Sequence, residues 1–125
     1  MKAFEELQND AMRMQKYLET KAPEQDDLII ERMTFLEVMI AKSGNLLADA
    51  KYLQDKARLD AIKQVISDPS FQDKQASFIN KFVDAAGKDF NHIVTWIDRI
   101  NSAAAKQHQG LITILSYKKE QMKLV

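Results

Sequence analysis

The sequence has no cysteine, and its 125 residues include only 3 glycines and 2 prolines. Without cysteine, the chain can form no disulfide, no thiolate nucleophile and no cysteine-ligated zinc site. With so few residues that interrupt helices, long continuous elements are possible. The length is that of one domain with a modest hydrophobic core, and we expect residues 1–125 to form that single domain.

The sequence also lacks a long apolar run and a net charge. No stretch approaches the ~18 apolar residues that a membrane span needs, and Met1-Lys-Ala-Phe-Glu-Glu lacks the apolar region of a signal peptide. The 18 basic and 18 acidic residues cancel, which argues against long-range attraction to nucleic acid or anionic lipid. We therefore expect a cytoplasmic protein that binds neither membrane nor nucleic acid.

What the sequence does contain is helical periodicity in a globular composition that is 46% apolar and 29% charged. The spacing predicts a first helix over residues 2–21, because apolar residues recur every three or four positions and Pro23 disfavours the helical conformation at Ala22. A second helix is expected over 23–66, with Pro23 in its first turn. Its apolar positions include Ile29, Met33, Leu36, Ile40, Ser43, Leu47, Ala50 and Gln54.

The strongest break in the chain is the segment 67–70, where Asp68 is an N-cap candidate and Pro69 suits a first helical position. Ser70 with Asp73 is a competing capping pair. A third helix is expected over about 70–123, with Gly110 as a possible break. A short connection makes flanking helices antiparallel neighbours. The sequence therefore predicts an all-α fold in which a short N-terminal helix packs on a long, coiled-coil-like helical hairpin.

Folding the hairpin at Asp68-Pro69 gives an expected register. Ala50 comes opposite Gly87, and Ile40 comes opposite Ile97. Gly44 lies in the middle of the second helix, where we expect a close helix approach to explain it.

The apolar faces are wider than three helices of these lengths can cover. The first helix spans at most half of the hairpin at 1.5 Å per residue. Oligomerisation of the chain with itself is the simplest way to bury the remainder. The apolar residues expected to need such a partner include Phe35, Leu46, Leu53, Phe82 and Trp96.

No catalytic constellation can be assembled from the sequence. His92 and His108 are the only histidines, and on one helix their separation of ~24 Å is too large for one metal ion. Asp89 and His92 are better explained as a surface pair than as metal ligands. Glycine-rich phosphate loops and paired Glu-x-x-Glu motifs are absent as well. We expect no enzyme activity, no metal and no cofactor.

One polar strip on the third helix is a candidate ligand site. Trp96 is the only tryptophan, and its usual role would be in the core or in a subunit interface. Trp96 could alternatively stack on a ligand base. With Arg99, Ser102 and Lys106 it forms a face that is either solvated or able to bind an anionic ligand, and Tyr17 is a further candidate ligand-binding residue.

The one basic cluster is Lys118, Lys119 and Lys123 near the C-terminal end. Cations there are favoured by the helix dipole, which is sufficient to explain them. The hairpin register also places this cluster near the acidic stretch 24–31, so an ion pair between the two is expected. A role in nucleic-acid binding would need more positive charge and interleaved aromatic residues.

The segments Leu46-Leu-Ala-Asp-Ala-Lys-Tyr-Leu53, Asp98-Arg-Ile-Asn101 and Leu115-Ser-Tyr-Lys-Lys-Glu120 resemble small, uncharacterised all-helical proteins of phages and prophages of gut Bacteroidetes. The likeness covers about half of the chain, and none of these segments is a functional motif. In outline, a short helix on a long hairpin is also similar to phage proteins that sequester cyclic-nucleotide immune signals between the subunits of an oligomer. A shared fold does not establish a shared function.

The resulting hypothesis is a non-catalytic, homo-oligomeric binding protein, encoded by a phage and acting in the host cytoplasm. It would capture a small anionic, nucleotide-like ligand or a host protein. Two alternatives stay open at this point: an accessory protein of phage DNA recombination or replication, and a structural helical adaptor without a ligand.

Overall fold

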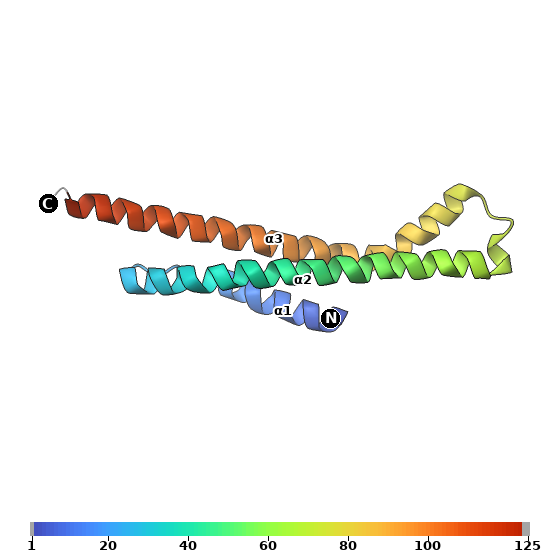
Figure 1. The fold of residues 1–125 in the computed structure, drawn as a ribbon, viewed down its shortest axis with the longest axis horizontal. Coiled ribbons are helices and arrows are strands. Elements are labelled where there is room, and N and C mark those ends of the chain that lie inside the picture. Colours follow the sequence, from blue (N-terminus) through green and yellow to red (C-terminus); the bar gives the residue numbers. More distant parts are fainter. Residues whose placement is uncertain (1, 124–125) are drawn as a thin grey trace.

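The computed structural model describes residues 2–123, so Met1 and residues 124–125 of the expected domain lie outside the described part. The described elements are α1 (Phe4–Leu18), α2 (Asp26–Ser67), the 3-10 turn η1 (Pro69–Phe71) and α3 (Ala76–Lys123). Helices α2 and α3 form a long antiparallel hairpin, and α1 lies beside its middle part (Figure 1). The predicted all-α fold, with a short N-terminal helix packed on two longer helices, is confirmed.

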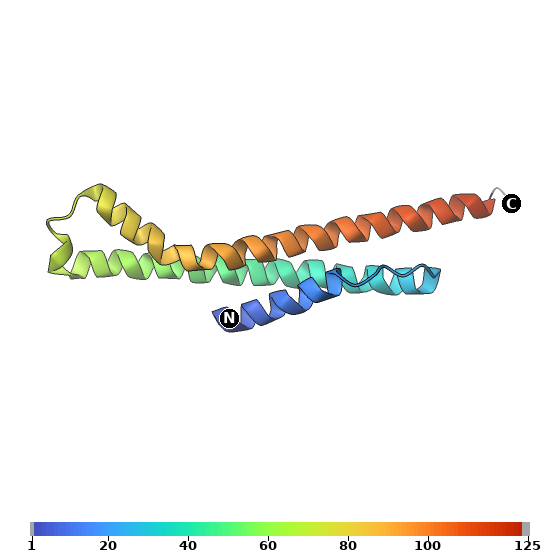
Figure 2. The same ribbon diagram turned by 180° about the vertical axis from the view of Figure 1, so that it is seen from behind.

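The helix bounds differ from the expected ones at three places. α1 ends at Leu18, and the next backbone N–H groups, of Glu19 and Thr20, donate to Gln15 and Tyr17 carbonyls. Residues 19–25 then run in an extended path along the first turns of α2 (Figure 2), so α2 begins at Asp26 and not at residue 23. α3 begins at Ala76 and runs without a break through Gly110.

The hairpin tip is longer than the short turn expected at 67–70. Asp68 caps η1 by accepting a hydrogen bond from the Ser70 backbone N–H at 2.9 Å, and the hydrogen bonds from Ser70 hold the pKa of this carboxyl below its usual value. The Phe71 ring then packs on Phe82, with centroids 4.9 Å apart, and on Phe78 at 6.3 Å. The first turns of α3 splay away from α2 at this end of the hairpin (yellow in Figure 1).

The core is a single apolar cluster at the meeting of the three helices. α1 contributes Leu7 and Ala11, both fully buried, and α2 contributes Leu36 and Ala50. The α3 side is built by Ile93, Ile97, Ile100, Ala104 and Leu111. Burying such side chains contributes about 1.5–3 kcal/mol each, which is the main term that holds the hairpin together. Among residues 2–123, no helix is both long enough and apolar enough to cross a membrane.

The register predicted for the hairpin is wrong by about one helical turn. Ile40 was expected opposite Ile97. Its backbone carbonyl instead accepts a hydrogen bond, at 2.9 Å, from the side chain of Asn101, which lies one turn further along α3. The reason is the connection between the helices, which occupies residues 68–75 where a turn at Asp68-Pro69 was expected. When the connection is longer, a later residue of α3 comes to lie opposite a given residue of α2.

Polar side chains fix this register within the apolar seam. Asn101 also donates to the Ser43 hydroxyl at 2.8 Å, and Ser43 is fully buried. Gln54 donates to the Gly87 carbonyl at 3.2 Å and to the Asn91 side chain. A shift of register would leave these buried groups without partners, at a cost of about 1–3 kcal/mol each.

The glycines differ in what surrounds them. A Cβ atom added at Gly44 or Gly110 would meet nothing within 4 Å, so a close helix approach does not explain Gly44. A Cβ atom added at Gly87 would lie 2.6 Å from Arg58 Nε, because the Arg58 side chain crosses over this glycine.

We expect Gly44→Ala and Gly110→Ala each to raise the free energy of unfolding by about 0.5–1 kcal/mol, since alanine loses less backbone entropy in a helix. Gly87→Leu should lower it by about 1–3 kcal/mol through overpacking against Arg58. Urea denaturation of the three variants measures both effects. A less stable Gly44→Ala variant would show that another surface presses on this face of α2.

Candidate functional site

The C-terminal end of α1 is fixed to the hairpin by one buried guanidinium. Arg32 of α2 is only 7% exposed. Its Nη atoms donate to the Thr20 hydroxyl at 2.8 Å, to Gln107 Oε1 at 3.0 Å, and to the carbonyls of Tyr17 and Thr20. Gln107 in turn donates to the Leu18 carbonyl at 2.9 Å. Two side chains from the hairpin therefore cap the last turn of α1.

The charge of Arg32 is offset without a carboxylate. Within residues 2–123, Arg32 forms no ion pair, and its guanidinium lies over the Tyr17 ring at 4.7 Å from the centroid. The carbonyls at a helix C-terminus carry a partial negative charge, and an aromatic face attracts a cation. The positive charge of Arg32 therefore stabilises the position of α1, because it lies at the negative, C-terminal end of the α1 helix dipole.

Two further contacts hold the rest of α1 in place. The Phe4 ring meets Phe90 of α3 edge to face, with centroids 5.3 Å apart, and Trp96 Nε1 donates to Gln15 Oε1 at 3.4 Å. With α1 held at both ends, a groove of about 550 Å³ remains between α1 and α2. It is lined by Lys2, Asp10, Arg13, Met14, Tyr17, Phe35, Val38, Met39, Lys42, Asn45, Leu46 and Asp49.

The groove combines an apolar and aromatic floor with a charged rim. The rings of Tyr17 and Phe35 lie 4.3 Å apart at one end of the floor, tilted by 31°. Phe35 is 52% exposed although it is aromatic, so its ring offers free surface to a ligand. Lys42 lines the groove from the α2 side.

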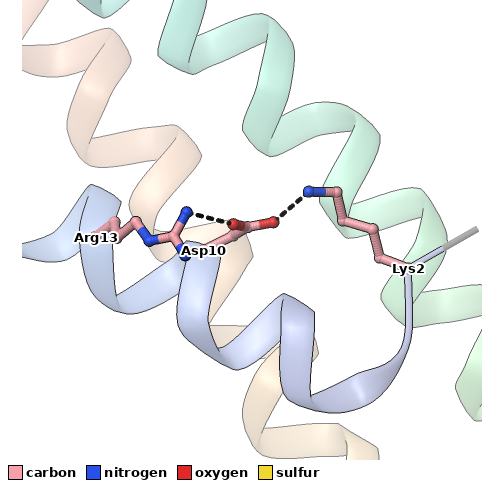
Figure 3. A network of polar contacts seen from close by, with 3 residues as sticks. All are labelled: Lys2, Asp10 and Arg13. Atoms are coloured by element: carbon pink, nitrogen blue, oxygen red, sulfur yellow. Dashed lines mark hydrogen bonds and ion pairs between the residues drawn. The ribbon is translucent and has the colours of Figure 1, made fainter.

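The rim of α1 carries a small ionic network (Figure 3). Asp10 accepts from Lys2 Nζ at 2.6 Å and from Arg13 Nη1 at 3.5 Å. The hydrogen bond and charge of Asp10 raise the pKa of Lys2. The Arg13 side chain is 78% exposed, so its hold on Asp10 is weak and its guanidinium is free to turn to another anion.

The structure separates the ligand residues predicted from the sequence. Tyr17 lines the groove, whereas Trp96 lies against Gln15 and His92 on the α3 side of α1. Arg99, Ser102 and Lys106 are exposed on α3 and do not line the groove. The sequence could not show this separation, because it depends on how α1 seats between the two long helices.

The basic cluster is partly engaged in the hairpin. Lys118 Nζ pairs with Asp26 at 2.9 Å and donates to the Glu24 carbonyl at 2.6 Å, which confirms the expected contact with the acidic stretch. Lys123 lies 3.7 Å from Glu120 of its own helix, and Lys119 is exposed. The cluster therefore has less free positive charge than its sequence suggests.

The histidines serve packing and surface contacts. His108 Nε2 lies 3.0 Å from Glu37 Oε1, and the His92 ring lies 5.9 Å from Trp96. Within the described residues, no three His, Asp or Glu side chains gather in a way that could hold a metal ion.

Sequence reasoning missed Arg32 and Gln107 as the residues that seat α1, and missed the α1–α2 groove. A signal for Arg32 was present: it lies between Ile29 and Leu36 on the buried face, where a charged residue needs a specific partner. The seam was expected to include Met33, which is only partly buried.

The chain matches no protein-family model, no curated protein and no solved structure.

Replacing Arg32 by methionine keeps an unbranched apolar stem but removes every donor to the end of α1. We expect the free energy of unfolding to fall by about 1–3 kcal/mol, because four backbone and side-chain acceptors lose the hydrogen bond from Arg32. Hydrogen exchange should show faster exchange in Phe4–Leu18, with little change at the hairpin tip. Arg58→Met is the matched control, since the only ion pair of Arg58 among residues 2–123 has a distance of 4.0 Å. Unchanged exchange in α1 would contradict this role for Arg32.

Proposed function

We propose that the protein is a non-catalytic, homo-oligomeric binding protein that captures a small anionic, nucleotide-like ligand in the groove between α1 and α2. The observation that carries the ligand part is the composition of this groove. An exposed ring of Phe35 beside Tyr17 suits a planar base, and Lys42 and Arg13 stand where a phosphate could be held. The likeness in outline to phage proteins that sequester cyclic nucleotides supports the same class of ligand.

The oligomeric part rests on surface area. The chain exposes 8817 Å², whereas a compact monomer of this mass exposes about 6,800 Å². The excess of about 2,000 Å² on one chain is more than twice the ~800 Å² that each partner buries in a standard protein–protein interface. Much of the excess is apolar, because large side chains such as Ile66, at 80%, and Phe35, at 52%, remain exposed.

The alternative functions have narrower support. The same exposed apolar surface is also compatible with a helical adaptor that binds other proteins and no small ligand. A role in phage DNA recombination or replication depends on the basic cluster, of which Lys118 already pairs with Asp26. Mobility shifts at low salt with a Lys119→Ala variant test that role, and the proposal expects no shift with either protein.

Thermal-shift screening against cyclic di- and trinucleotides and cyclic ADP-ribose isomers tests the proposed ligand class. We expect at least one of them to raise the melting temperature, since a ligand that binds only the folded state stabilises it by mass action. Lys42→Ala and Tyr17→Leu should remove the shift. Lys16→Ala, an exposed cation of α1 outside the groove, should keep it.

Two outcomes would count against the groove. No shift at saturating concentrations of any of these compounds would contradict the nucleotide-like class. A shift that is lost with Arg99→Ala and kept with Lys42→Ala would place the ligand on the α3 strip.

A further inference from the structure

Helix α2 is apolar on two faces, and only one of them is covered. The uncovered face carries six large apolar side chains, each between 43% and 80% exposed. Their positions belong to two sets that each repeat every seven residues and are offset from each other by three, which is the spacing that packs one helix along another. They are Leu28, Phe35, Val38, Tyr52, Leu59 and Ile66.

The polar residues that continue the same spacing complete this outward row of α2. They are Glu31, Lys42, Asn45, Asp49, Lys56 and Lys63, and all of them belong to α2. From residue 28 to residue 66 the row extends ~57 Å at 1.5 Å per residue. The part of the row from Phe35 to Asp49 lines the groove, and the rest of the row lies outside it.

From this row we infer that α2 pairs with α2 of a second copy of the chain, in antiparallel orientation and centred near Leu47. This inference rests on the homo-oligomeric part of the proposed function and specifies its interface. The occupant is a second copy because the row complements itself when it is reversed.

The apolar ends match in this arrangement. Leu28 comes opposite Ile66 of the partner subunit, and Phe35 comes opposite Leu59 of the partner subunit. Between these two apolar layers, Glu31 comes opposite Lys63 of the partner subunit, so that opposite charges meet. By two-fold symmetry each of these contacts occurs twice.

A parallel pairing of the same row is disfavoured by charge. In register, it would place every charged residue of the row opposite its own copy, which gives five layers of like charge: Glu31, Lys42, Asp49, Lys56 and Lys63. Like charges that face each other across an interface cost several kcal/mol. Reversal of one helix removes all five layers.

The pairing also changes the groove. Tyr52 of the partner subunit comes opposite Lys42, and Lys56 of the partner subunit comes opposite Val38. The second copy therefore adds an aromatic ring and a cation to the wall of the site. A groove that is open in one chain becomes enclosed between two.

The first test is the oligomeric state of the full chain, measured by sedimentation equilibrium. We expect a dimer or a multiple of it, and Leu59→Arg should raise the dissociation constant at least about 10-fold, since two apolar contacts are lost at once. Ile30→Arg is the matched control, because Ile30 is apolar and 56% exposed on α2 but lies outside the row. Circular dichroism shows whether each variant is folded.

Charge reversal tests the register. Glu31→Lys and Lys63→Glu should each raise the dissociation constant about 10-fold, and the double variant should restore it, because the pair is then reversed and not broken. Cysteines at positions 35 and 59 add a direct readout, because the natural chain has none. Within one helix these positions are ~36 Å apart, so any disulfide joins two chains.

A chain that stays monomeric at all concentrations overturns the inference. The outward row would then be a binding surface for a different protein. An oligomer that survives Leu59→Arg, or a double charge variant as weak as the single ones, overturns it as well. None of these results depends on a nucleotide. Loss of ligand binding with an intact dimer contradicts the proposed ligand and leaves the pairing standing.

Discussion

The position of α1 depends on the buried guanidinium of Arg32. Three carbonyl or hydroxyl oxygens at the end of α1 converge on it, and Gln107 joins them from α3, so all three helices meet at one polar point. A buried cation without a carboxylate is costly unless its hydrogen bonds are met. This requirement allows little freedom in where α1 ends. The seat of α1 in turn leaves a groove on one side of α2 and leaves the outward row of α2 uncovered.

Much of the fold could be predicted from the sequence because its signals are local. Apolar spacing identified three helices, and Asp68-Pro69 marked the hairpin tip where Asp68 does cap a turn. The pair between Lys118 and Asp26 followed from antiparallel geometry alone, since at the open end a displacement of one turn still leaves a lysine near the acidic stretch.

The register and the site could not be predicted, because they depend on contacts that are distant in sequence. The Phe71 ring packs against Phe82 and lengthens the connection, which displaces every pairing along the seam. Gln54 and Asn101 then select the register by hydrogen bonds to backbone carbonyls of the opposite helix. Likewise, Tyr17 and Trp96 lie on different sides of α1, and no spacing in the sequence reveals this.

The proposed function and the inferred pairing share part of α2, because Phe35, Val38, Lys42, Asn45 and Asp49 line the groove and also belong to the outward row. The inward face of α2 packs on α3 and gives the chain its stability, whereas the outward row carries large apolar side chains that stay between 43% and 80% exposed in a single chain. Natural sequences keep such surfaces when they have a partner. Enclosure by the second copy would also strengthen electrostatic contacts to an anion, because exclusion of water lowers the local dielectric constant.

The most direct test is the distance between two copies of the same residue. Nitroxide labels on a single introduced cysteine, measured by pulsed dipolar spectroscopy, report it in solution. Antiparallel pairing centred near Leu47 predicts labels within about 20 Å at Asn45→Cys and about 60 Å apart at Asp27→Cys, from the rise of 1.5 Å per residue. Equal short distances at both positions, or no dipolar coupling between chains at either, would contradict the account.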